Sequence, residues 1–206
     1  MTQARRYRDD KGQAFPIYIT VVAGLLFLAL VYFAVGQATV NRSSAQTAAD
    51  AAALAVAQDT RDRLAAEWVK AVLNPDVWEQ IFHGDAQGAD FSCSRAQELA
   101  QRNHAHVLDC ASRGPLAYAV DVETDKTMGK SVVPITENRR SKGHALAVIE
   151  PLCDFVPLAA DTPPDTLPRL TCKNNRYWDL DPKNLTDLPE PRDLFDVHLA
   201  DRQPNE

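Results

Sequence analysis

The N-terminal part of the chain consists of a short charged segment followed by a long apolar block. No charged side chain occurs between Gly12 and Asn41, and residues 15–36 are almost continuously apolar. A helix rises about 1.5 Å per residue, so this block extends roughly 33 Å and can cross a hydrocarbon core of about 30 Å. The pattern therefore predicts a transmembrane helix over residues 12–36.

The charges beside the apolar block predict its orientation. Residues 1–11 contain four basic and two acidic side chains. Because positively charged flanks stay in the cytoplasm, we expect a cytoplasmic N-terminus, a single pass through the cell membrane, and an extracytoplasmic chain after residue 41. The alternative is a cleaved signal peptide, with Gly36 and Ala38 at the cleavage site. Its apolar core would span only about 7–15 residues, so the longer block favours an uncleaved anchor.

The chain after the apolar block is polar, rich in alanine and strongly helix-forming. Residues 39–73 contain neither glycine nor proline, and Asn74-Pro75 marks the end of the helix. Alanine has the highest helix propensity, so the span and a stalk over residues 37–74 should form one helix of about 60 residues. Four alanines recur at every fourth position and form a ridge of small side chains: Ala45, Ala49, Ala53 and Ala57. Such a ridge allows close approach, either to the chain's own sheet or to the helices of other subunits.

The segment over residues 75–153 predicts a small α+β module outside the membrane. Residues 95–103 have the pattern of a short helix. Residues 106–110, 116–122 and 144–149 have the pattern of strands, and apolar residues alternate most clearly in the second of them. The expected fold is therefore α+β, with a long N-terminal helix, one short helix and a three-stranded antiparallel sheet.

The last segment, residues 154–206, is dominated by prolines and carboxylates. Nine of the 13 prolines lie at or after Pro151. With no periodic apolar pattern, this acidic segment is expected to form an extended or partly disordered tail. Residues 191–200 are the exception, because a proline followed by apolar residues predicts a short helix that either lies on the surface or docks a partner.

All four cysteines follow the apolar block, which places them in an oxidising compartment if the predicted orientation holds. Four cysteines allow three disulfide pairings. We favour Cys93–Cys110 with Cys153–Cys172, because each bond closes a short loop. A zinc site is the alternative, but the cysteines form no C-x-x-C and have no histidine at ligand spacing, so no metal or other cofactor is expected.

Charge and motif content argue against several functional classes. The net charge of −6 divides into +2 for residues 1–11 and −8 for residues 42–206, where 18 basic side chains oppose 26 acidic ones. A phosphate-binding surface needs a basic face, so we expect no nucleic-acid partner. The sequence contains no G-x-S-x-G, H-E-x-x-H or Walker motif, so we expect no catalytic residue and no enzymatic activity.

Two stretches resemble TadE/TadG-like Flp pilus-assembly proteins. In the first, Gly12-Gln13-Ala14 opens into the apolar block, and residues 45–55 read AQTAADAAALA, which is similar to the family's Q-x-A-A-D-A-A-A-L-A segment outside the membrane. In the second, residues 93–122 resemble the outer domain of small TadE-like proteins, with a cysteine, a short helix, a strand bearing a second cysteine, and an alternating strand.

The resemblance implies a non-enzymatic, pseudopilin-like component of a Tad pilus or secretion assembly, with a pilin-like outer module. Its expected partners are membrane lipid and other pilin-like or Tad subunits, contacted through the N-terminal helix. Some relatives are processed by a prepilin peptidase after a glycine, and the corresponding bond here is Gly12–Gln13. The fifth residue after that bond is Ile17, where pilins typically carry glutamate. The alternative function is an anchored ectodomain that acts as an adhesin, receptor or inhibitor for an extracellular ligand.

Overall fold

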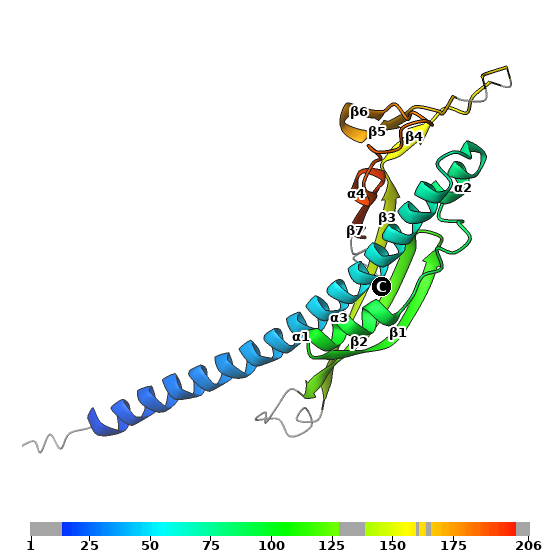
Figure 1. Ribbon diagram of the computed structural model, residues 1–206. Coiled ribbons are helices and arrows are strands. Elements are labelled where there is room, and N and C mark those ends of the chain that lie inside the picture. Colours follow the sequence, from blue (N-terminus) through cyan, green and yellow to red (C-terminus); the bar gives the residue numbers. More distant parts are fainter. Residues whose placement is uncertain (1–13, 128–138, 160, 164–165, 201–206) are drawn as a thin grey trace, which may run out of the picture.

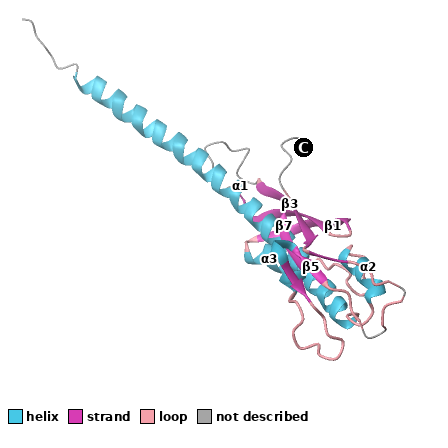
Figure 2. Ribbon diagram, turned by 90° about the horizontal axis from the view of Figure 1, so that it is seen from above, coloured by secondary structure: helices cyan, strands magenta, loops and turns pink. Residues whose placement is uncertain are grey.

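One long helix runs through most of the length of the molecule (Figure 1). The computed structural model describes residues 14–127, 139–159, 161–163 and 166–200. Helix α1 spans Ala14–Lys70 and contains 57 residues, which confirms that the apolar block and the alanine-rich segment form one helix. Its first half stands alone, whereas its second half lies along a sheet, as the views in Figures 1 and 2 agree.

Short helices follow where α1 ends. A 3-10 helix, η1 (Pro75–Val77), leads directly into α2 (Trp78–Phe82). Helix α3 (Ser94–Arg102) confirms the helix predicted over residues 95–103. Ala96 and Ala100 of α3 are buried, so this helix lies with its small-residue face against the core.

The main sheet has four antiparallel strands in the order β1-β2-β3-β7. The strands are β1 (Ala105–Gly114), β2 (Ala117–Thr127), β3 (Arg140–Pro151) and β7 (Phe195–Leu199). The first three correspond to the three predicted strands, each longer than expected. The fourth strand was not predicted: it comes from the tail and pairs with β3 from Ala147↔Leu199 to Pro151↔Phe195.

The proline-rich tail also forms a second, smaller sheet at the far end of the molecule. Strands β4 (Cys153–Phe155), β5 (Leu170–Cys172) and β6 (Arg176–Trp178) lie in that order. A 3-10 helix, η3 (Lys173–Asn175), connects the last two. The expectation of an extended tail therefore needs correction over these residues, because pairing with neighbouring strands satisfies the backbone hydrogen bonds that proline-rich sequence cannot satisfy within a helix.

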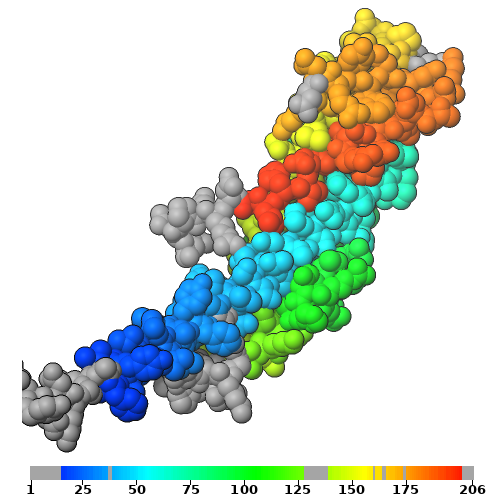
Figure 3. Space-filling model, turned by 90° about the vertical axis from the view of Figure 1, so that its left-hand side faces the viewer, coloured from blue at the N-terminus to red at the C-terminus, as the bar shows by residue number. Residues whose placement is uncertain are grey.

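The helix predicted over residues 191–200 is present only in its first turn. Helix α4 (Pro191–Leu194) begins with proline at its first position, as expected, and the chain then becomes strand β7. Leu194 and Phe195 are both fully buried. Pairing with β3 and burial of these side chains outweigh the local helical pattern, and Figure 3 shows the tail (orange and red) lying directly on α1 (cyan).

Candidate membrane anchor and assembly surface

The first half of α1 exposes apolar side chains on all sides. Fifteen large hydrophobic residues from Phe15 to Val40 are 45–83% exposed, and none of the most apolar stretch is buried within the molecule. Exposed apolar surfaces of this extent normally mark a contact with lipid or protein. Among the described residues, α1 is the one helix long and apolar enough to cross a membrane.

The alanine ridge lies in the second half of α1, along the length of the helix, and is fully covered. Ala45, Ala49, Ala53 and Ala57 are each 0% exposed. They face the main sheet and α3, and their neighbours Ala48 and Ala52 are equally buried. Of the two interpretations of the ridge, the structure therefore supports packing on the chain's own sheet, and these four side chains are not accessible to another subunit.

The helix and the sheet approach each other closely at Gly143 in β3. A Cβ atom built on Gly143 would lie 2.3 Å from the carbonyl oxygen of Ala45 and 3.0 Å from the backbone nitrogen of Gln46. The Gln46 side chain also donates a hydrogen bond of 2.8 Å to the carbonyl oxygen of His144. Only glycine fits this position, so Gly143 joins the start of the sheet to α1 where the helix leaves the apolar half. The strand predicted over residues 144–149 begins one residue after Gly143, and the sequence pattern did not indicate this role.

Two disulfides hold the module outside the apolar half. Cys93 bonds Cys110 and so links the start of α3 to β1, and Cys153 bonds Cys172 across β4 and β5. These are the two pairs that the short loops favoured. Each bond restricts the unfolded chain and stabilises a module with a thin core.

The far end of α1 carries the aromatic part of the core. The ring centroids of Trp68 and Trp78 lie 5.4 Å apart, and Trp78 contacts Phe155 at 5.3 Å. Phe82 in turn contacts Phe195 at 5.4 Å. Phe155 at the start of the tail and Phe195 near its end thus complete the core that α1 and α2 begin. The tail is therefore an integral part of the module.

Tyr118 of β2 is a buried titratable residue of the main sheet. It is 3% exposed, and its hydroxyl donates a hydrogen bond of 2.8 Å to the carbonyl oxygen of Pro115. Burial raises the pKa of the Tyr118 phenol above its ordinary value of 10.0, and a hydrogen bond with Thr60 opposes this in part. The phenol is therefore neutral at physiological pH and acts as a structural hydrogen-bond donor.

The face of the main sheet that points away from α1 is polar. Its histidines each lie beside a carboxylate: His106 near Asp125 at 3.0 Å, His144 near Asp121 at 2.7 Å, and His198 near Asp196 at 3.3 Å. The last pair and Glu150 bring three ligand-type atoms within 4.8 Å of one another, which the sequence did not predict. All three residues are exposed, and Lys173 already binds Glu150 at 2.5 Å, so we interpret this group as a solvated ion-pair network.

An apolar groove lies at the far end of the molecule, between α2, the β1–β2 turn and strand β4. Its volume is about 450 Å³, and Phe82, Leu116 and Phe155 are among the residues that line it. Nothing in the sequence pattern indicated this groove, because its walls come from three segments far apart along the chain.

The remaining predicted site falls at the start of the chain. Gly12 and Gln13, the candidate prepilin-peptidase bond, lie outside the described residues. Ile17, five residues after that bond, is 63% exposed on the apolar half of α1.

The comparisons with known proteins agree with the resemblance noted for the N-terminal region. Residues 12–59 match the Tad family model, which describes Flp pilus-assembly proteins of the TadE/G-like type. The match covers the apolar half of α1 and most of its alanine-rich half, and residues 93–122 lie outside it. No curated protein and no solved structure matches the chain. The match supports a pilus-related role in a family that is membrane-associated and structural.

Proposed function

We propose that this protein is a membrane-anchored, pseudopilin-like component of a Tad pilus or secretion assembly, with its N-terminus in the cytoplasm. One observation carries the proposal: a single helix is apolar and exposed over its first half and is the core helix of a disulfide-bonded module over its second. A continuous helix transmits position and tilt from the membrane to the module. The role is structural and involves no catalysis.

The orientation rests on the charges beside the anchor and on the disulfides. The basic residues 1–11 precede the anchor, and both disulfides follow it. An oxidising compartment on the far side of the membrane accounts for both features. The protein should resist alkaline carbonate extraction, and protease added outside the cell membrane should cleave the module but not a tag at the N-terminus. Loss of membrane association after replacing Leu25 and Leu28 by arginine would support the anchor.

Contact with other Tad subunits should occur through the exposed half of α1. Because the alanine ridge is covered, lateral packing needs the apolar side chains that lie before residue 41. A photo-crosslinking amino acid at Phe27, 65% exposed, should capture pilin-like subunits, whereas the same amino acid at Ala49, 0% exposed, should not. Absence of any subunit crosslink from the exposed half would contradict an assembly role.

The groove at the far end favours a second candidate function, an anchored ectodomain that binds an extracellular ligand. Its apolar lining and its position away from the membrane suit a small apolar ligand or a peptide side chain. Replacing Leu116 by glutamine in this groove should leave pilus assembly unchanged if the anchor carries the function. Loss of adhesion with normal assembly would support the ectodomain.

A further inference from the structure

We infer that the membrane-proximal end of the module carries a basic collar that binds the headgroups of anionic phospholipids around the anchor. The collar consists of Arg42 of α1, Lys126 of β2, Arg139 directly before β3, and Arg140 and Lys142 at the start of that strand. All five side chains are exposed. This inference rests on the proposed membrane anchor and adds a lipid partner to it.

The register of the sheet brings these residues to one place. Arg140 pairs with Thr127, next to Lys126, and Lys142 pairs with Glu123. On α1, Arg42 lies three residues before Ala45, which is the residue that touches Gly143. Residues three apart share a helix face, so Arg42 lies on the side of α1 toward the sheet.

The height of the collar along α1 matches the headgroup layer. Ala45 lies nine residues after Gly36, the end of the apolar block, which corresponds to roughly 14 Å along the helix. Arg140 precedes Gly143 by three strand residues, or roughly 10 Å back toward the membrane. It therefore lies roughly 4 Å beyond the apolar block, within a headgroup layer about 5–8 Å thick.

The charge of the collar opposes that of the module as a whole. Residues 42–206 carry a net charge of −8, yet five basic side chains gather at this end. Within the described part of the chain, the nearby carboxylates are Glu123, which lies 3.7 Å from Arg140 and opposite Lys142 in the sheet, and Asp125, which pairs with His106. Among the described residues, none of the other four collar side chains lies within 4.0 Å of a carboxylate. Their charge is therefore free to bind an anionic surface, where each basic side chain strengthens binding about fivefold.

The test measures which lipids surround the full-length protein. Wild type and a variant with Lys126→Gln, Arg139→Gln and Lys142→Gln are reconstituted into phosphatidylcholine bilayers that contain spin-labelled phosphatidylglycerol or spin-labelled phosphatidylcholine. We expect the protein to immobilise phosphatidylglycerol preferentially, and the variant to lose up to about 100-fold of this preference, about fivefold for each of the three charges removed. The preference should also weaken at high salt, because screening shortens the range of the attraction.

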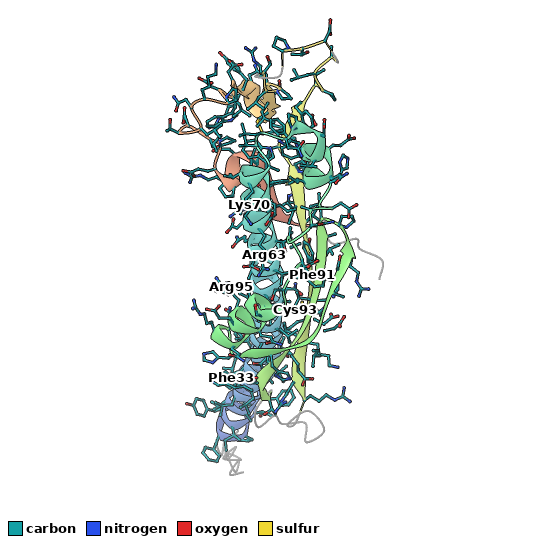
Figure 4. The ribbon with its side chains drawn as sticks, turned by 45° about the vertical axis from the view of Figure 1, so that its right-hand side comes forward. Phe33, Arg63, Lys70, Phe91, Cys93 and Arg95 are labelled. Atoms are coloured by element: carbon teal, nitrogen blue, oxygen red, sulfur yellow. A yellow bond between two sulfur atoms is a disulfide. The ribbon has the colours of Figure 1, made fainter. Side chains whose placement is uncertain are left out.

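The matched control removes the same charge far from the membrane. Arg63→Gln, Lys70→Gln and Arg95→Gln replace three exposed basic residues that Figure 4 labels along the module. This control should keep the wild-type lipid preference. Equal losses in both variants, or no loss in the collar variant, would overturn the inference. The charge-preserving Arg139→Lys variant should retain the preference, and its loss would also count against the collar.

Failure of the anchor and failure of the collar give different results. A protein that does not float with the vesicles or that washes off in alkaline carbonate contradicts the anchor itself. A protein that stays in the bilayer but shows no preference for phosphatidylglycerol contradicts only the collar. The basic residues 1–11 are unchanged in every variant, so any preference they cause persists in all of them and is not mistaken for that of the collar. A collar variant that keeps its lipid preference but loses crosslinks to other subunits would assign the collar to an acidic protein surface instead.

Discussion

Adding one methyl group at Gly143 should separate the module from α1. The new Cβ would lie 2.3 Å from the Ala45 carbonyl oxygen and 2.6 Å from its carbon, whereas ordinary contacts begin at 3.4 Å. Backbone atoms cannot rotate away, so helix and strand must move apart by roughly 1 Å. Such overpacking costs about 1–3 kcal/mol. Weakening the Gln46–His144 hydrogen bond adds about 1 kcal/mol, and the stiffer unfolded chain offsets about 0.4–1 kcal/mol.

The expected net loss for Gly143→Ala is about 1–3.5 kcal/mol, or a melting temperature lower by roughly 2–14 °C for a module of this size. Thermal unfolding of the full-length protein in detergent measures it, with the fluorescence of buried Trp68 and Trp78 as the signal. Gly36→Ala is the matched control, because no atom lies within 4 Å of a Cβ at that position. Its melting temperature should not fall and should rise slightly, because alanine favours the helix and a Cβ at this position meets no atom.

Two results would refute this reasoning. An unchanged melting temperature for Gly143→Ala would mean that the strand does not approach α1 so closely. The second test adds Ala45→Gly to Gly143→Ala. Because the obstacle is the backbone of Ala45, removing its methyl group should not restore stability. Restoration would show that the clash involves a side chain.

Three further predictions concern the module. Replacing Cys93 and Cys110 by serine should cost about 3 kcal/mol in denaturant unfolding, and an unchanged midpoint would exclude this disulfide. The raised pKa of Tyr118 means that its stabilisation is complete below pH 10.0 and is lost as the pH rises through the folded-state value. Melting temperatures above pH 10.0 should therefore fall less steeply for Tyr118→Phe than for wild type, and parallel curves would contradict this. Phe195→Ala should cost about 3–5 kcal/mol, whereas Val156→Ala, at 81% exposure, should cost little; equal melting temperatures would mean that the tail is separable.

The local pattern of the sequence correctly predicted the elements that depend on short-range physics. The apolar block and the alanine-rich segment specify one helix, because helix propensity and the absence of Gly and Pro act residue by residue. Helix α3 and strands β1 to β3 were predicted near their observed positions for the same reason. The family resemblance of residues 12–59 also depends on this local pattern, and it is confirmed.

The sequence left open what covers the alanine ridge, and the tertiary structure decided it. Small side chains at every fourth position permit close packing but do not determine which element packs against them. The sheet covers the ridge because Gly143 lets β3 approach the Ala45 backbone, and that contact joins residues 98 positions apart, as does the neighbouring Gln46–His144 hydrogen bond. The exposed half of α1 then becomes the surface that remains for lipid or other subunits.

The tail is the part of the chain whose structure the local sequence pattern predicted least well. Prolines and carboxylates gave residues 154–206 the appearance of an unstructured segment, and residues 191–200 that of a helix. The chain instead returns to pair β7 with β3 and to bury Phe195 against Phe82. By itself, the sequence determined a long helix, apolar in its first half and rich in alanine in its second, followed by a disulfide-bonded α+β module. Only the tertiary structure decided the fourth strand and the grouping of the basic residues that we propose as a collar. Both depend on contacts between segments far apart in the sequence, and the local pattern of one segment does not indicate which other segment it contacts.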